Sequence, residues 1–117
     1  HSAPRLALPG CGDGWIAVGE AAMALDPICG DGTGYALRGA IAAVAVMNGI
    51  AGGMPPARCL RHYDMRLAGA FRNHLEGCRD LYGGDFGGSA WDGERRANAL
   101  ALKAISEPLE VVAEQLQ

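Results

Sequence analysis

Eighteen of the 117 residues are glycine, and most of them are gathered in four clusters that divide the chain. The clusters lie at residues 10–14, 30–34, 52–53 and 83–88. Such clusters mark turns, because glycine adopts positive φ without strain and lets another group approach the backbone closely. The stretches between them are short and apolar before residue 30 and long enough for helices after residue 34.

The first glycine cluster separates two short apolar runs, Arg5–Leu8 and Trp15–Val18. Turn residues between two such runs predict a pair of strands joined by a hairpin or loop. We therefore expect these two runs to form a short β element at the start of the fold.

The second glycine cluster leads into Tyr35–Ile50, an alanine-rich stretch that predicts a helix. The apolar part, Ala36–Gly52, is interrupted by Arg38 and is shorter than a bilayer span requires. We expect this helix to be buried and not to cross a membrane. Gly49, Gly52 and Gly53 are expected to end it.

Pro55 and Pro56 are expected to open the longest helix, since proline is tolerated in the first helical turn. Apolar residues recur along this helix at a spacing of three to four, which predicts one buried face. That face comprises Leu60, Tyr63, Leu67, Phe71, His74, Leu75 and Cys78. The arginines on the other faces form a solvated surface or, alternatively, a docking surface for an anionic group; they are Arg58, Arg61, Arg66, Arg72 and Arg79.

The segment Tyr82–Gly93 predicts a loop, with Ser89 as a cap for the last helical region. That region, from about Glu94 to Gln117, is expected to break near Ser106, ahead of Pro108. The expected fold is mainly α, with three to four helices and a short N-terminal strand pair. It forms a single domain over residues 1–117, in which residues 1–34 carry the strands and the glycine-rich loop and residues 35–117 are helical.

Composition excludes several classes of function. The net charge of −3 argues against a nucleic-acid partner, which requires clustered basic surface. The four cysteines contain no CxxC pair, so no metal site is expected. With no secretory signal, the expected location is the cytoplasm. No histidine has a visible partner, so no catalytic residue is named, and His74 is expected to be a satisfied core residue.

Residues 15–40 carry the chemistry, in the order strand, acidic residue, proline turn, glycine-rich loop and helix start. The Glu20 carboxylate can accept hydrogen bonds from the hydroxyls of a polyol or ribose. Unpaired amides at the helix start, at Gly32, Thr33 and Gly34, can stabilise negative charge on a ligand. The alternative is a solvated glutamate beside a structural turn.

The phosphate-binding fingerprints of nucleotide proteins are absent from the sequence. Gly30–Gly34 has the wrong spacing for GxGxxG and follows no strand directly. The Walker A lysine is missing as well. The phosphate-binding half of a dinucleotide site is therefore not encoded in this chain.

The same segment resembles the second flavin motif of FAD-dependent aromatic hydroxylases, which flavin-dependent halogenases and geranylgeranyl-reductase-like proteins share. In that superfamily the motif reads Gly-Asp-Ala-Ala, a few residues, proline, then Gly-x-Gly and a helix. The matching residues here are Val18–Ala22, Asp26–Pro27, Gly30–Gly34 and Ala36–Ala40. The match covers about 26 of the 117 residues and indicates flavin use without distinguishing one chemistry from another.

The resemblance implies a role for each matching residue. Glu20 would bond the ribityl chain, Pro27 would lie near the flavin ring, and the three amides of residues 32–34 would face the pyrimidine edge. The implied FAD contacts are Gly19, Glu20, Pro27, Gly30, Asp31, Gly32, Thr33 and Gly34.

Two positions depart from the superfamily pattern. Glu20 stands in place of aspartate and adds one methylene to the ribityl contact. Gly30 and Asp31 stand where halogenases carry small hydroxyl residues at the halide site, and a carboxylate at Asp31 would repel a halide. Halogenation is therefore disfavoured, and Asp31 is a candidate for tuning the flavin.

The resemblance implies the C-terminal fragment of a FAD-dependent oxidoreductase or monooxygenase that acts on a small-molecule substrate. Its partner would be the N-terminal FAD-binding part of the parent protein, and the fragment alone would be inactive. One alternative is a flavoprotein that matures another protein's side chain. The other is a small helical interaction module without flavin, whose exposed apolar surface would allow self-association.

Overall fold

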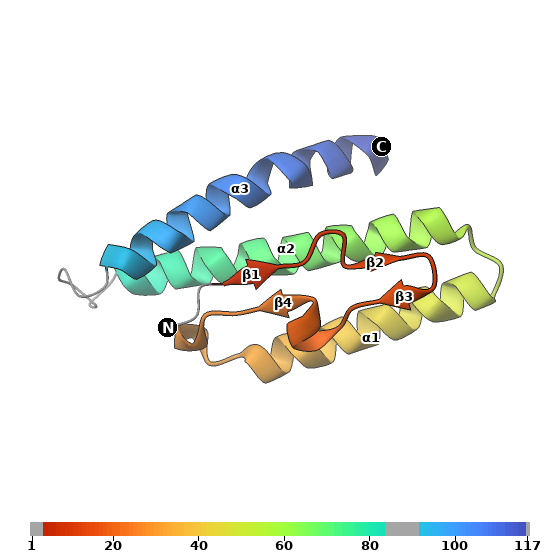
Figure 1. The fold of residues 1–117 in the computed structure, drawn as a ribbon, viewed down its shortest axis with the longest axis horizontal. Coiled ribbons are helices and arrows are strands. Elements are labelled where there is room, and N and C mark those ends of the chain that lie inside the picture. Colours follow the sequence, from red (N-terminus) through yellow and green to blue (C-terminus); the bar gives the residue numbers. More distant parts are fainter. Residues whose placement is uncertain (1–3, 84–91, 117) are drawn as a thin grey trace.

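The computed structural model describes residues 4–83 and 92–116, with side chains given for residues 4–28, 30–83 and 92–105. Helix α2 lies between α1 and α3, and the strands lie beside α1 and α2 (Figure 1). The elements in chain order are β1 (Arg5–Leu6), β2 (Cys11–Gly12), β3 (Trp15–Ile16), η1 (Gly19–Ala21), β4 (Met23–Ala24), η2 (Pro27–Cys29), α1 (Gly32–Ala51), α2 (Pro56–Gly83) and α3 (Asp92–Leu116), where η denotes a 3₁₀ helix. The expected fold class, mainly α with short N-terminal strands, is confirmed.

The strands do not pair as the sequence predicted. β1 pairs antiparallel with β4, and β2 pairs antiparallel with β3, so the two runs expected to form a pair belong to different pairs. The reason is the two-residue turn Asp13–Gly14, in which Gly14 has φ of 83°. This tight turn folds Trp15–Ile16 back onto Cys11–Gly12. Arg5–Leu6 is left to pair with the later strand.

Helix α2 supplies most of the core, as its apolar stripe predicted. Its buried residues are Cys59, Tyr63, Leu67, Ala68, Phe71, His74, Leu75, Cys78 and Tyr82. The arginines expected on the other faces are exposed, apart from the half-buried Arg72. Tyr82 belongs to this helix and not to the loop that was expected to begin there, because α2 continues to Gly83.

Helix α1 begins at Gly32, three residues before the expected start. The expectation that it is buried is wrong, because within this helix only Ala43 and Val46 are buried. The expectation that it is too short for a membrane is also wrong on length. Among the described residues α1 is the one helix with the length and apolar composition to cross a bilayer, a test that the core helix of a soluble protein also passes.

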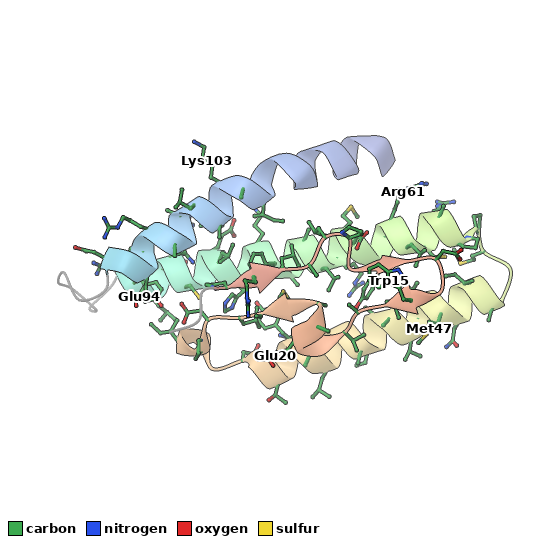
Figure 2. The ribbon with its side chains drawn as sticks, in the orientation of Figure 1. Trp15, Glu20, Met47, Arg61, Glu94 and Lys103 are labelled. Atoms are coloured by element: carbon green, nitrogen blue, oxygen red, sulfur yellow. The ribbon has the colours of Figure 1, made fainter. Side chains whose placement is uncertain are left out.

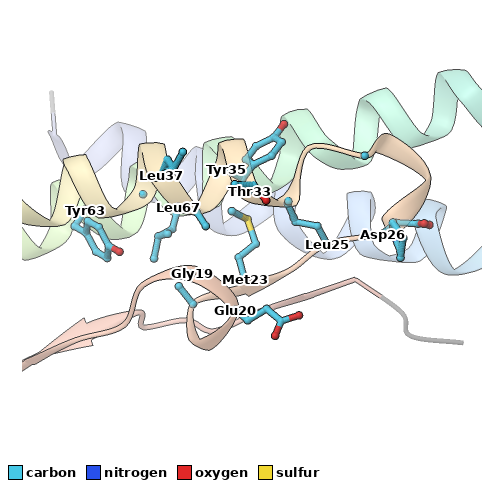
Figure 3. A pocket seen from close by; sticks show the side chains of 16 residues that line it. Gly19, Glu20, Met23, Leu25, Asp26, Thr33, Tyr35, Leu37, Tyr63 and Leu67 are labelled. Atoms are coloured by element: carbon cyan, nitrogen blue, oxygen red, sulfur yellow. The ribbon is translucent and has the colours of Figure 1, made fainter.

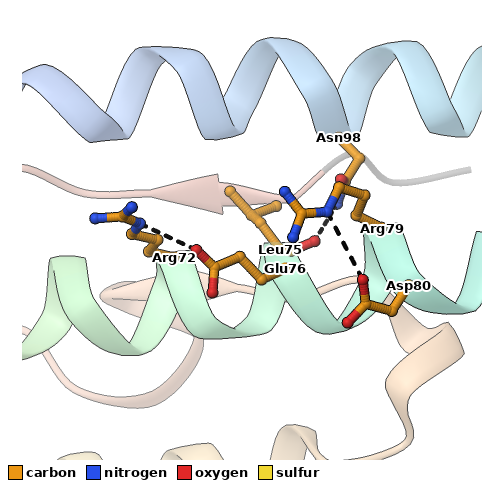
Figure 4. Close-up of polar contacts among 6 residues, drawn as sticks. All are labelled: Arg72, Leu75, Glu76, Arg79, Asp80 and Asn98. Carbon is orange, nitrogen blue, oxygen red and sulfur yellow. Dashed lines mark hydrogen bonds and ion pairs between the residues drawn. The ribbon is translucent and has the colours of Figure 1, made fainter.

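Helix α3 runs without interruption from Asp92 to Leu116. The expected break near Ser106, ahead of Pro108, is therefore wrong. A proline inside a helix removes one backbone hydrogen bond but does not prevent the flanking turns from continuing. The helix packs on α2, where buried Asn98 donates a hydrogen bond of 2.9 Å to the Leu75 carbonyl (Figure 4). The proposed cap Ser89 lies outside the described residues.

Candidate functional site

A cavity of about 650 Å³ lies where η1, β4, the η2 loop and the first half of α1 meet α2. Figure 3 shows Gly19 and Glu20 on one side of it and Thr33 and Tyr35 on the other. Met23 and Leu25 contribute apolar surface between them. Its lining is Gly19, Glu20, Ala22, Met23, Leu25, Asp26, Pro27, Gly30, Gly32, Thr33, Tyr35, Ala36, Leu37, Gly39, Tyr63 and Leu67.

Most of the residues that the sequence assigned to a cofactor lie around this cavity. Six of the eight line it, namely Gly19, Glu20, Pro27, Gly30, Gly32 and Thr33. They come from η1, the η2 loop and the start of α1, three elements that the chain brings together from residues 19 to 33. Gly19 and Gly30 have φ of 58° and 64°, so glycine at these two positions is explained by the backbone alone.

The remaining two assigned residues, Asp31 and Gly34, do not line the cavity. The exposed Asp31 carboxylate pairs with the Arg38 guanidinium at 2.9 Å. A Cβ on Gly34 would meet the Asp31 carboxylate, so a larger residue there would require the exposed Asp31 side chain to shift. Asp31, the candidate for flavin tuning, therefore lies at the start of α1 outside the cavity lining, in an ion pair with Arg38 of the same helix.

Two glycines of α1 have no structural reason to be glycine. Gly32 and Gly39 lack positive φ, and a Cβ added to either would meet no atom within 4 Å apart from the local helix backbone. Both line the cavity. A side chain at either position would occupy cavity space, so the glycines keep that space open to a group that approaches the helix backbone closely.

The start of α1 presents backbone donors at the cavity. The first helical hydrogen bond runs from the Tyr35 amide to the Asp31 carbonyl, at 3.0 Å. The amides of Gly32, Thr33 and Gly34 precede it and have no partner inside the helix. Asp31 occupies the N-cap position, but its side chain makes no capping hydrogen bond. The amide dipoles of this turn thus favour negative charge near Gly32 and Thr33.

The η2 loop is attached to α2 through Asp26. The Asp26 amide donates to His74 Nε2 at 2.8 Å, and the Tyr82 hydroxyl donates to Asp26 Oδ2 at 2.5 Å. Burial lowers the pKa of His74, against the opposing effect of Asp26. Burial, together with the hydrogen bond to Asp26, raises the pKa of Tyr82. His74 is a core residue as expected, although its buried Nδ1 has no hydrogen-bond partner among the residues that the structure describes.

The strand side is attached to α2 by two further side chains. The Tyr63 hydroxyl donates to the Ala17 carbonyl at 2.5 Å, and Asp64 Oδ1 accepts the Gly10 amide at 2.7 Å. The Cys11 thiol also approaches Asp64 Oδ1, at 3.7 Å. Burial and the adjacent Asp64 carboxylate raise the pKa of Cys11 to about 11, so this thiol stays protonated at neutral pH.

Sequence reasoning missed the cavity residues that come from distant positions. The apolar stripe of α2 predicts that Tyr63 and Leu67 are core residues. No local sequence pattern indicates that these two side chains also line the cavity. Asp26 has a local signal, because an aspartate directly before a proline is a typical helix N-cap. Its side chain accepts a hydrogen bond from the Ile28 amide at 3.0 Å. Within residues 4–83 and 92–116, no group of three or more histidine, cysteine or acidic residues is placed to hold a metal ion.

Comparison with known proteins gives no further assignment. No protein-family model matches the chain, and neither a curated protein nor a solved structure matches it.

Proposed function

We propose that this chain forms part of the flavin site of a FAD-dependent oxidoreductase, where it contributes the ribityl and pyrimidine-edge contacts. One observation carries the proposal. Six residues that the flavin-motif resemblance singled out line one cavity of about 650 Å³, within the size range of ligand sites.

The chemistry of the cavity lining fits this part of a flavin. The Glu20 carboxylate is an acceptor for ribityl hydroxyls. The amides of Gly32 and Thr33 are donors suited to the anionic edge of a reduced ring. Met23 and Leu25 offer an apolar wall for a flat aromatic system. Flavin, when bound, supplies hydride transfer or oxygen chemistry, and the protein holds and orients it.

The lining does not fit the diphosphate of FAD. It contains no lysine or arginine, and α1 offers a single uncapped helix start. We therefore propose that the diphosphate and adenosine are held by an N-terminal FAD-binding part of a longer flavoprotein, which also shapes the site for a small-molecule substrate. The exposed stripe of α1, formed by Leu37, Ile41, Val44 and Met47, is the surface proposed to contact that part. The chain alone is then expected to bind FAD weakly and to show no turnover.

The same stripe supports one alternative function. Four large apolar side chains exposed by 48–70% on one helix are typical of a protein-binding surface. In this alternative, α1 binds a partner protein or a second copy of the chain, and the cavity is structural. Flavin binding separates the two functions.

Titration of the 117-residue chain with riboflavin, followed by amide NMR, tests the proposal. Riboflavin lacks the diphosphate, so its binding does not require the phosphate contacts that the cavity lacks. We expect shifts at Gly19, Glu20, Gly32 and Thr33, with a dissociation constant of about 1 mM or below.

A matched pair of variants locates the binding. Gly39→Leu places a side chain in the cavity and is expected to abolish the shifts. Gly77→Leu adds the same side chain to α2, at a glycine whose Cβ would also meet no atom within 4 Å but which does not line the cavity. It is expected to leave the shifts unchanged. No shifts in the unmodified chain, or equal shifts in Gly39→Leu, would contradict the flavin site and favour the interaction module.

A further inference from the structure

Asp26 is held by α2 at two separate atoms. Its amide donates to His74 Nε2, and its carboxylate oxygen Oδ2 accepts the Tyr82 hydroxyl. Its other oxygen, Oδ1, accepts the Ile28 amide inside the η2 loop. One residue thus links the loop that carries Pro27 and Gly30 to two turns of the longest helix.

The direction of these bonds fixes the form of the His74 ring. A nitrogen that accepts a hydrogen bond carries no proton, so Nε2 must be unprotonated while it holds the Asp26 amide. The neutral ring then carries its proton on Nδ1. Nδ1 is buried and has no acceptor among the described residues, an arrangement that costs stability. Packing in the core alone therefore does not explain a histidine at position 74. Its hydrogen bond with the η2 loop is the one that Nε2 accepts from the Asp26 amide.

We propose that His74 and Tyr82 are positioning residues of the cavity, which clamp Asp26 and so fix the Pro27–Gly30 wall, and that only the Nδ1-protonated neutral form of His74 closes the clamp. Neither residue lines the cavity, so both act through Asp26, which does. The importance of this wall for a ligand rests on the proposed flavin function. The clamp itself does not.

The clamp is sensitive to pH through His74. A proton on Nε2 would face the Asp26 amide donor and break the bond. The groups around the ring are the Asp26 carboxylate on the η2 loop, Cys78 one turn along α2 with Sγ 3.5 Å from Nε2, and Tyr35 of α1, whose ring packs edge-on at 5.8 Å between centroids. Burial keeps the pKa of His74 below its ordinary value of 6.5, so the clamp is closed at neutral pH and opens in acid.

Amide hydrogen exchange of the 117-residue chain, with no ligand added, tests the clamp. We expect His74→Leu to lower the protection of the Asp26 amide about tenfold relative to the unmodified chain, since one hydrogen bond is lost. His74→Gln should restore most of it, because the Gln carbonyl oxygen can take the place of Nε2 as acceptor. Tyr82→Phe should lower the protection less than His74→Leu does, because the bond to His74 remains.

The histidine resonances and a matched variant complete the test. Long-range ¹H–¹⁵N spectra of the His74 ring should show the proton on Nδ1 at neutral pH. Asp26 protection should fall in acid as the ring is protonated, since burial holds the His74 pKa below its ordinary value. His62→Gln replaces an exposed histidine of the same helix and should change neither. A proton on Nε2 at neutral pH, or Asp26 protection equal in His74→Leu and the unmodified chain, would overturn the clamp.

Riboflavin titration separates this inference from the proposed function. If riboflavin fails to bind the unmodified chain while Asp26 protection follows His74, the flavin function fails and the clamp stands. If riboflavin binds the unmodified chain and His74→Leu with equal affinity, the positioning role is overturned and the flavin function stands. A loss of affinity in His74→Leu that His74→Gln reverses would support both.

Discussion

Helices α1 and α2 lie side by side and use their apolar residues in opposite ways. On α2 the large residues Tyr63, Phe71 and Leu75 are buried. On α1 the buried residues are the small Ala43 and Val46, whereas large residues such as Leu37 and Ile41 are 62% and 70% exposed. Figure 2 labels another member of that exposed stripe, Met47. A helix that buries its smaller side chains and exposes its larger ones is not explained by the core it packs against.

The polar side chains show the same difference. From α2, Tyr63, Asp64 and His74 form hydrogen bonds with backbone groups of Ala17, Gly10 and Asp26, and so attach the N-terminal segment to this helix. From α1, the Asp31–Arg38 pair at its start is exposed and local to that helix. Helix α2 thus positions the fold, and α1 presents one surface to the cavity and one outward, with Leu37 at the edge that the two surfaces share. The apolar outer face of α1 is therefore the part of the described structure that packing within the chain explains least.

The largest difference between the two helices is expected when a large apolar side chain is truncated on each of them. Leu75→Ala removes a fully buried side chain and is expected to destabilise the fold by about 2–5 kcal/mol. Ile41→Ala removes a side chain that is 70% exposed and is expected to change stability by about 0.5 kcal/mol or less. Urea unfolding of both variants, followed by circular dichroism, measures the difference.

Protein concentration supplies the control for these truncations. If Ile41→Ala costs as much as Leu75→Ala, the outer face of α1 is buried in solution. A cost that grows with protein concentration would identify a second copy of the chain as the cover. If Ile41→Ala destabilises the fold as much as Leu75→Ala does, and equally at every protein concentration, the exposed position of Ile41 is contradicted.

A smaller effect is expected from the polar attachments of α2. Asp64→Ala leaves the Gly10 amide without its partner and is expected to cost about 1–3 kcal/mol. It also removes a carboxylate that raises the pKa of Cys11, so the thiol should react faster with iodoacetamide at a given pH. Urea unfolding and the rate of alkylation measure the two effects.

An exposed charge on the same helix gives the matched control. Arg61→Ala removes a side chain that is exposed and is expected to change neither stability nor Cys11 reactivity measurably. Equal stability of Asp64→Ala and the unmodified chain would show that the strand segment is not held by α2 through this residue. Unchanged alkylation would contradict the influence of Asp64 on Cys11.

The difference between the helices also decides what the sequence could reveal. The spacing of Tyr63, Phe71 and Leu75 predicts the buried face of α2 because one apolar stripe on a polar helix has one place to go. Helix α1 is apolar all round, so its pattern predicts burial without naming the face, and that prediction was wrong for Leu37 and Ile41. Periodicity identifies a buried face only where the opposite face is polar.

For the cavity, the sequence could indicate only those residues that lie close together along the chain. Six of its residues between 19 and 33 could be singled out because they are close in sequence and match a single motif, whereas Ala22, Met23, Leu25 and Asp26 were not assigned to the site. Its closure by Tyr63 and the clamp on Asp26 by His74 could not, because they depend on contacts across 46 and 48 residues. Pro108 shows the opposite limit, since a local rule predicted a helix break that α3 does not have.

The smallest effect on stability is expected from glycine-to-alanine substitutions, and it should be the same on α1 and α2. Gly39→Ala on α1 and Gly77→Ala on α2 each add one methyl group where it would meet no atom within 4 Å. Alanine is favoured over glycine in a helix interior by about 0.5–1 kcal/mol, so both variants should be stabilised alike. Agreement in urea unfolding would show that α1 and α2 differ in burial and not in intrinsic helix stability. Destabilisation by Gly39→Ala alone would mean that another group already occupies the space beside Gly39, and that the cavity is smaller in solution than its 650 Å³.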